Sequence, residues 1–139
     1  MSINNAYQKY KENQVNLANQ GQLILMLYDG AIKFVNKALE CMDKKAIEQT
    51  HKNITKTKDI ITELTTSLNM EAGEISQRLL SIYMYLNRRL SEANLSKQKA
   101  PLLEVKKHLS ELREAWDKAS KTADVKEKVG SGGGINIAT

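Results

Sequence analysis

Two histidines are the residues whose chemistry could most readily support a metal site or catalysis in this chain of 139 residues. His51 follows Glu48 at the Glu-x-x-His spacing, which on a four-helix bundle is typical of di-iron carboxylate centres. Such centres need a second copy of the motif and two further glutamates that face the core. Here Ile47 and Thr50 take the positions expected to face inward, and Glu48 is expected to face outward. The sequence therefore predicts no metal centre at this motif.

The other histidine offers no better site. His108 lies four residues after Glu104, but Val105 and Leu109 occupy the apolar positions beside it. An exposed histidine in the middle of a helix, such as His51, has the geometry of a phosphotransfer bundle. Exposed histidines are common on helical bundles, however, and no other feature of the sequence supports that function.

A cysteine and a glycine run are the remaining features with chemical interest. Cys41 is the only cysteine, which excludes an intramolecular disulfide and a cysteine-based zinc site. The run Gly-Ser-Gly-Gly-Gly at residues 130–134 does not lie between a strand and a helix, so it is not a nucleotide-binding loop. We therefore expect a protein that is not an enzyme and that has no cofactor.

Composition indicates an all-α protein. The chain is 41% hydrophobic but only 5% aromatic, contains one proline and lacks continuous β-branched runs. It has no apolar run long enough for a signal peptide or a membrane span, so we expect a cytoplasmic location without membrane insertion. The net charge of +5 is spread over several helices with acidic residues between the basic ones, which argues against nucleic-acid binding.

Four amphipathic stretches predict an antiparallel up-and-down four-helix bundle. We assign residues 1–18 to an N-terminal arm or cap, 19–122 to the bundle and 123–139 to a flexible C-terminal tail. Asn19 can cap the first long helix, and Asp43 can end it and cap the second. Pro101 suits the first turn of the fourth helix.

The first long helix, about residues 20–42, organises the rest. Its apolar residues recur at steps of three and four, so they are expected to face the core. They are Leu23, Met26, Leu27, Gly30, Ala31, Phe34, Val35, Ala38, Leu39 and Met42. Leu25, Tyr28 and Ile32 fall beside this row, and Tyr28 is expected to be partly exposed. Gly30 predicts either the close approach of another backbone or ordinary tight packing.

The other three helices have similar apolar rows. The second row is Ile47, Thr50, Ile54, Thr57, Ile61, Leu64 and Leu68, with Ile60 beside it. The third is Ile75, Leu79, Ile82, Tyr83, Leu86, Leu90 and Ala93, and the fourth is Leu102, Val105, Leu109, Leu112, Trp116 and Ala119. Residues 69–73 form the break before the third helix, where Gly73 supplies conformational freedom.

The N-terminal arm has two tyrosines, Tyr7 and Tyr10, which one helical turn would place on the same side. A segment this short does not hold itself as a helix in water, so it needs a surface to lie on. It is either a docked arm or a removable cover over an apolar groove. The residue pattern therefore predicts a non-enzymatic helical bundle that binds a partner, but it does not identify that partner.

Four motifs resemble the flagellin export chaperone family, FliS, over about residues 4–120. They are Asn5-Ala6-Tyr7 with Tyr10, L-M-L-Y-D-G-A-I-K-F at residues 25–34, R-L-S-E-A-N at residues 89–94, and E-L-R-E-A-W at residues 111–116. The order and spacing of all four make the resemblance specific. The chain departs from the family at Asn19-Gln20, where a Thr/Ser-Pro pair is usual, at Ala72-Gly73 in place of a glycine pair, and at residues 82–86, which read I-Y-M-Y-L.

The resemblance implies a cytoplasmic chaperone dedicated to flagellin. The bundle would bind the disordered C-terminal segment of flagellin, prevent its premature polymerisation and assist its delivery to the flagellar export gate. By the same resemblance, the arm with Tyr7 and Tyr10 covers a hydrophobic groove. The predicted groove residues are Tyr28, Ile60, Ile61, Leu64, Leu68, Tyr83 and Leu86, and core packing is the rival interpretation for each of them.

Two other classes of function compete with a chaperone. One is a regulatory or adaptor bundle that binds another amphipathic helix, and the other is a basic bundle that binds nucleic acid. Self-association into a homodimer is also open, because an uncovered groove can pair two copies.

Overall fold

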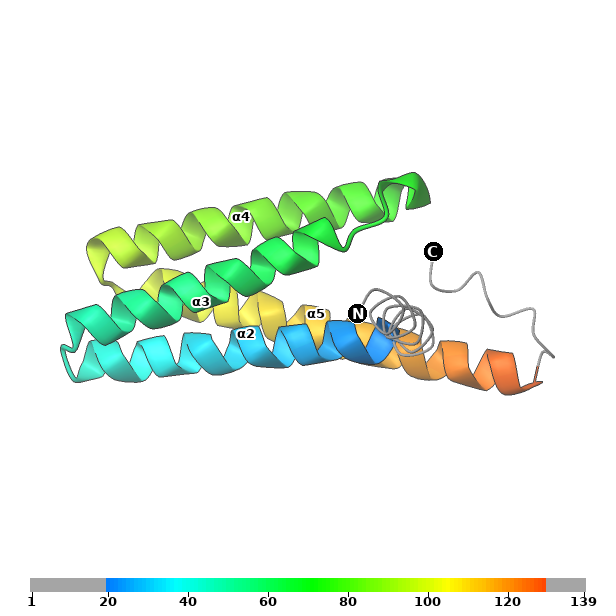
Figure 1. Ribbon diagram of the computed structural model, residues 1–139, viewed down its shortest axis with the longest axis horizontal. Helices are drawn as coiled ribbons and strands as arrows, with labels where there is room; N and C mark the ends of the chain where they lie inside the picture. Colours follow the sequence, from blue (N-terminus) through cyan, green and yellow to red (C-terminus); the bar gives the residue numbers. More distant parts are fainter. Residues whose placement is uncertain (1–19, 130–139) are drawn as a thin grey trace, which may run out of the picture.

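The computed structural model describes residues 20–129, with side chains as far as Lys121. Its four long helices are α2 (Gln20–Asp43), α3 (Ile47–Thr66), α4 (Glu74–Ser96) and α5 (Lys99–Val129), and a short 3-10 helix, η1 (Met70–Ala72), joins α3 to α4. The long helices run up and down in alternation, so the predicted antiparallel four-helix bundle is confirmed for these residues (Figure 1). The N-terminal arm and the last ten residues lie outside the described range.

The helices form a ring: each one packs against the next along the chain, and the last, α5, packs against the first, α2. α2 contacts α3 and α5, and α4 contacts α3 and α5. Helix α5 continues past Thr122, where the apolar pattern ends, as far as Val129. None of the helices in the described residues is both long and apolar enough to span a bilayer.

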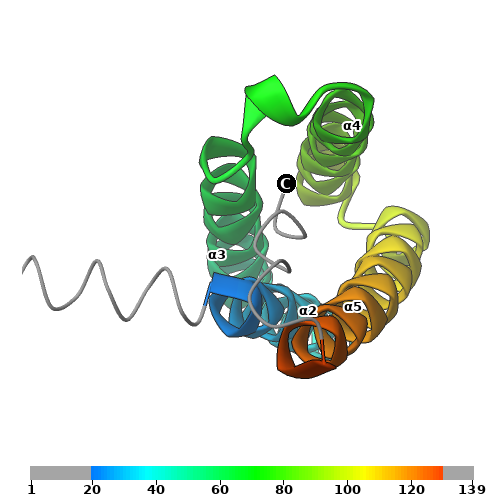
Figure 2. The ribbon, with the colours of Figure 1, turned by 90° about the vertical axis from the view of Figure 1, so that its right-hand side faces the viewer.

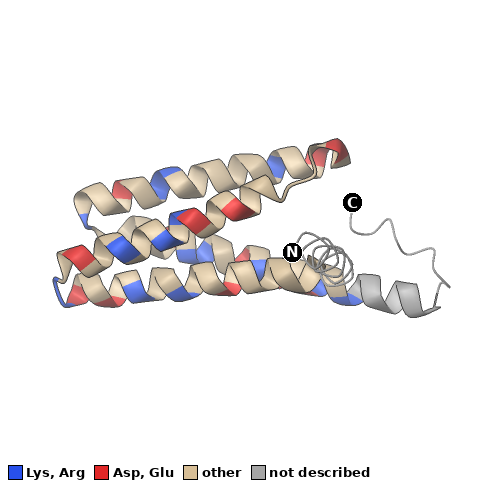
Figure 3. Cartoon of the chain, viewed as in Figure 1, with Lys and Arg blue, Asp and Glu red and all other residues tan. Residues whose placement is uncertain are grey.

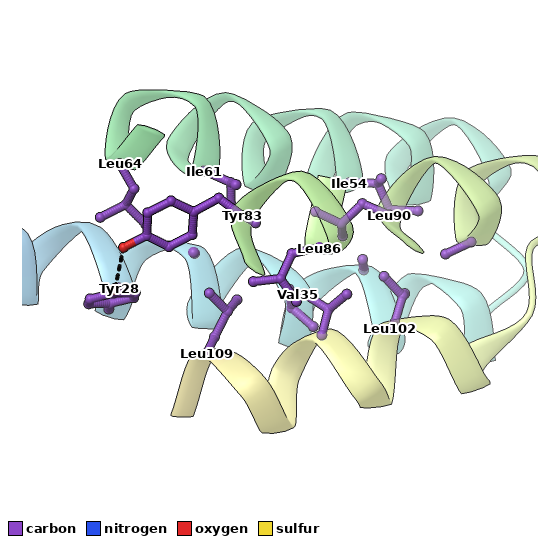
Figure 4. Close-up of a cluster of buried hydrophobic side chains, with 14 of the residues drawn as sticks. Tyr28, Val35, Ile54, Ile61, Leu64, Tyr83, Leu86, Leu90, Leu102 and Leu109 are labelled. Atoms are coloured by element: carbon purple, nitrogen blue, oxygen red, sulfur yellow. Dashed lines mark hydrogen bonds between the residues drawn. The ribbon is translucent and has the colours of Figure 1, made fainter. Parts of the chain in front are cut away.

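One apolar core runs through the ring and has contributions from all four long helices (Figure 4). Its buried residues are Ile24, Tyr28, Ala31, Val35, Ala38, Ile54, Ile61, Leu64, Tyr83, Leu86, Leu90, Ala93, Leu102, Val105 and Leu109. Their three- and four-residue spacing is the reason these stretches become amphipathic helices that pack together. Removing such a face from water stabilises the fold by about 25 cal/mol per Å² of apolar surface.

The buried face of α2 differs from the prediction. Leu23 and Met26 were expected to face the core but are 44% and 63% exposed. Ile24 and Tyr28 are buried in their place, and Tyr28 is only 2% exposed rather than partly exposed as expected. Two apolar rows lie side by side on this helix. Because α2 has α3 on one side and α5 on the other, the positions of both neighbours decide which row points to the centre of the bundle.

The connection between α2 and α3 is also built differently from the prediction. Asp43 ends α2 as expected, but it does not cap α3. Ala46 occupies the capping position and makes no side-chain hydrogen bond there. Asp43 instead forms an ion pair with Lys99 at the start of α5, which ties two neighbouring connections together. Asn19, the predicted cap of α2, lies outside the described residues.

The connection between α3 and α4 depends on the first and last residues of the predicted break, Asn69 and Gly73. The Asn69 side chain accepts a hydrogen bond from the Glu71 backbone amide at 3.0 Å, which starts η1. Ser76 on α4 donates its hydroxyl hydrogen to the Asn69 carbonyl at 2.6 Å. Gly73 then turns the chain into α4 with φ of 85° and ψ of −135°. Residues with a Cβ rarely adopt this conformation.

Replacing Gly73 with alanine is expected to lower the free energy of unfolding by about 1–2 kcal/mol, because the native φ is strained for any residue with a Cβ. Space is not the cause, since no atom lies within 4 Å of a Cβ built at this position. Urea denaturation would measure the change. The exposed neighbour Glu71 provides the control, because Glu71→Ala should change stability by less than about 0.5 kcal/mol. Equal effects of the two substitutions would refute the strain argument.

Candidate binding surface

The predicted groove residues divide into a buried set and a half-buried set. Five of them are at most 2% exposed and form part of the core. These five are Tyr28, Ile61, Leu64, Tyr83 and Leu86. In this conformation they shape the bundle from inside and are covered by their neighbours. Ile60 and Leu68 are half-buried and therefore present apolar surface to solvent. The predicted cap residues Tyr7 and Tyr10 lie outside the described residues.

Tyr28 and Tyr83 meet inside the bundle, although they are 55 residues apart in the sequence. Their hydroxyl oxygens are 2.5 Å apart, and either hydroxyl can donate the hydrogen bond (Figure 4). Burial raises the pKa of Tyr28 well above its ordinary value, and Tyr83 raises it further. Burial also raises the pKa of Tyr83, against a smaller lowering by the hydrogen bond from Tyr28. Both tyrosines are therefore neutral, and the pair joins α2 to α4 across the bundle.

Ile60 explains the glycine in the middle of α2. A Cβ built on Gly30 would lie 3.3 Å from the Cδ1 atom of Ile60, and no other atom of a neighbouring helix comes within 4 Å. The absent side chain thus makes room for an isoleucine side chain of α3 rather than for another backbone. Of the two interpretations of Gly30, tight packing is therefore correct.

Helix α5 follows α2 more closely than α4 toward its C-terminal end (Figure 2). Two contacts hold it there. The indole Nε1 of Trp116 donates to the Gly21 carbonyl at 3.0 Å, and the Nε of Arg113 donates to Asp29 at 2.7 Å. The N-terminal part of α4 therefore stands apart from α5 at this end of the bundle (Figure 2).

Several half-buried apolar side chains belong to the segments near this end of the bundle. They come from the connection after α3, the first half of α4 and the middle of α5, and all of them pack against the core. We call them the open-end surface, and they are Leu68, Leu79, Ile82, Leu112 and Trp116. Ile75, on the first turn of α4, is 60% exposed although it was expected to face the core. Apolar surface left accessible in this way indicates a binding site.

A polar network closes the gap between α4 and α5 farther along the bundle. Tyr85 donates its hydroxyl hydrogen to Glu104 at 2.6 Å, and the Nε of Arg89 donates to the same carboxylate at 2.6 Å. Those two hydrogen bonds hold the pKa of Glu104 below its usual range, and the bond from Tyr85 has the larger effect. The sequence alone does not indicate this network, because the residues come from two helices whose relative register only the fold determines.

The Glu-x-x-His motif has no metal-binding geometry. Glu48 and His51 are both exposed, and the His51 Nδ1 lies 2.8 Å from the Asn94 amide nitrogen on α4. Thr50 is buried as predicted, but Ile47 is 67% exposed because it begins α3 at the rim of the bundle. Among the described residues, no three acidic, histidine or cysteine side chains come together in a way that could hold a metal ion.

The amino-acid sequence of this chain is similar to those of known proteins. The family model of the flagellar protein FliS matches residues 3–123. A Bacillus subtilis protein named flagellar secretion chaperone FliS is 37% identical over 133 residues, which are 96% of this chain and 98% of the relative. The Salmonella typhimurium protein of the same name is 34% identical over 118 residues, 84% of this chain and 87% of its own. This chain therefore belongs to the FliS family of flagellar proteins.

Proposed function

We propose that this protein is a cytoplasmic secretion chaperone that binds the disordered C-terminal segment of flagellin. It keeps that segment from polymerising prematurely and delivers it to the flagellar export gate. Membership of the FliS family supports this function, and the open-end surface is the structural observation that carries it. The relatives are named flagellar secretion chaperones, which agrees with the proposal.

The open-end surface suits a disordered apolar segment. Leu68, Leu79 and Ile82 come from α4 and the connection before it, and Leu112 and Trp116 come from α5. A segment that folds as it binds buries on the order of 1,000–3,000 Å² and gives up several kcal/mol in ordering, so it can bind specifically and still be released. Occupying its apolar faces blocks their association with other flagellin chains without any need for ATP.

The predicted groove residues have two different roles in this proposal. Ile60 and Leu68 contact flagellin directly, whereas the buried residues hold the shape of the bundle beneath it. The latter are Tyr28, Ile61, Leu64, Tyr83 and Leu86. The arm at residues 1–18 covers the open-end surface through Tyr7 and Tyr10 until flagellin displaces it. A second copy of the chain would compete for the same surface, so a homodimer would form only in the absence of flagellin.

Calorimetric titration with a peptide of about the last forty flagellin residues tests the proposal. We expect one-to-one binding with a large negative heat-capacity change, which marks the burial of apolar surface. Leu79→Glu should weaken binding by about tenfold or more, because it places a charge in the proposed contact. A Tyr7→Ala, Tyr10→Ala double variant should change the affinity as well.

The matched control is Leu95→Glu, which places the same charge on a side chain that is 88% exposed near the opposite end of α4. It should bind the peptide like the unaltered chain. Melting temperatures of both glutamate variants separate lost binding from lost folding, and Leu68→Ser gives a second, milder change in the same surface. The absence of any heat with the flagellin peptide would refute the chaperone proposal and favour an adaptor of another helix.

A further inference from the structure

Three lysines converge on one aromatic ring between α2 and α3. Phe34 is half-buried on α2, and the ammonium groups of Lys33 and Lys37 each lie 5.8 Å from the centre of its ring. Lys56 on α3 brings a third ammonium group to 5.2 Å from the same centre. We call these four residues the Phe34 cluster. The face of a ring attracts a cation, which accounts for each contact taken singly.

The charges of the Phe34 cluster are not compensated. Some other cations of the bundle have carboxylate partners, such as Lys99 with Asp43 and Arg113 with Asp29. Among the described residues, no carboxylate forms an ion pair with Lys33, Lys37 or Lys56, and each of these ammonium groups instead lies near the ring. Three positive charges around one ring repel each other, and a negative group bound among them would attract all three and offset that repulsion.

The seam between α2 and α3 is apolar where Ile60 of α3 packs over Gly30 of α2. Ile60 is half-buried, and so is Leu27, which precedes Gly30 by three residues on α2. Lysine and arginine segments lie on neighbouring turns of the two helices on this face (Figure 3). The exposed carboxylates of Asp59 and Glu63 follow Lys56 on α3, so the basic stretch is short.

We propose that the Phe34 cluster is a docking site for an acidic amphipathic helix of a partner protein. Lys33 and Lys37 are one turn apart on α2, so two carboxylates one turn apart on the docked helix would face them. Lys56 would meet the same helix from the α3 side. An apolar side chain between the carboxylates would lie against Phe34 and the seam. A nucleic acid fits less well, because Asp59 and Glu63 would repel its continuing row of phosphates.

This site is separate from the open-end surface. The cluster lies on α2 and α3, whereas the open-end surface is formed mainly by α4 and α5. The proposal therefore does not rest on flagellin binding, and the two can be tested apart. A chain saturated with the flagellin peptide should still prefer an acidic helix to its uncharged counterpart, because none of the three lysines is a proposed flagellin contact. Of the neighbouring seam, only Ile60 is one.

The probe is a synthetic alanine-based helical peptide of about 18 residues, with one leucine and glutamates three and four residues to either side of it. Its partner peptide carries glutamine in place of every glutamate. Titration of the full chain at low salt should show binding of the glutamate peptide about tenfold tighter than that of the glutamine peptide. The difference should shrink as salt is added, because exposed charges are screened.

Two triple variants of equal net charge locate the site. Lys33→Gln, Lys37→Gln, Lys56→Gln should remove most of the preference for the glutamate peptide. The control changes Lys44, Lys106 and Lys107 to glutamine, away from Phe34, and should keep that preference. Equal binding of the two peptides, or equal losses in the two triple variants, would overturn the proposal. Duplex DNA that binds more tightly than the peptide through the same three lysines would overturn it in favour of a nucleic-acid site.

Discussion

Replacing Leu86 with alanine is expected to lower the free energy of unfolding by about 2–5 kcal/mol, the range for removing a leucine side chain from a packed core. Leu86 has no exposed surface and lies at the centre of the bundle among side chains of other helices (Figure 4). The cost combines the lost burial of the side chain with the cavity that remains. Chemical denaturation monitored by circular dichroism would measure it.

Met84 supplies the control on the same helix. It is 60% exposed, so Met84→Ala should change the free energy of unfolding by less than about 0.5 kcal/mol. The comparison also bears on the predicted groove. If Leu86→Ala left stability unchanged, Leu86 could not be a core residue, and its assignment to an accessible groove would regain support.

Alkaline pH is expected to destabilise the protein through Tyr28 and Tyr83. Burial raises the pKa of both hydroxyls in the folded chain, whereas in the unfolded chain they ionise near pH 10. Above that pH the unfolded state binds fewer protons than the folded state, so stability falls as pH rises. Both tyrosines should contribute to this loss, which begins as the pH approaches 10. Below pH 9 the pair should have no effect on the pH dependence.

The double variant Tyr28→Phe, Tyr83→Phe isolates this effect. It removes both partners of the hydrogen bond, so no buried hydroxyl is left unsatisfied and stability at neutral pH should change little. Its alkaline loss should be smaller than that of the unaltered chain, as measured by urea denaturation across the pH range. Met84→Ala serves as the control, since Met84 is exposed and the substitution leaves every tyrosine in place. Parallel pH curves for the double variant and the unaltered chain would contradict the prediction.

The sequence by itself determined the helical architecture. Apolar residues at steps of three and four marked four long helices, and Gly73 marked the turn into α4. These features are local, because a helix face and a positive φ are set by residues within a few positions of each other. The four motifs at residues 5–10, 25–34, 89–94 and 111–116 together likewise indicated the FliS family, which the comparisons confirmed.

Only the tertiary structure decided which apolar residues are core and which form a surface. Tyr28 was expected at the edge of its helix and lies in the core, whereas Leu23 and Ile75 were expected in the core and are exposed. Periodicity placed Tyr83 in the apolar row of its helix, where it is buried, but α2 has apolar residues on more than one side, so periodicity alone could not orient Tyr28. Their hydrogen bond depends on the rotation and register of α2 against α4, and these are fixed jointly by all the contacts in the ring.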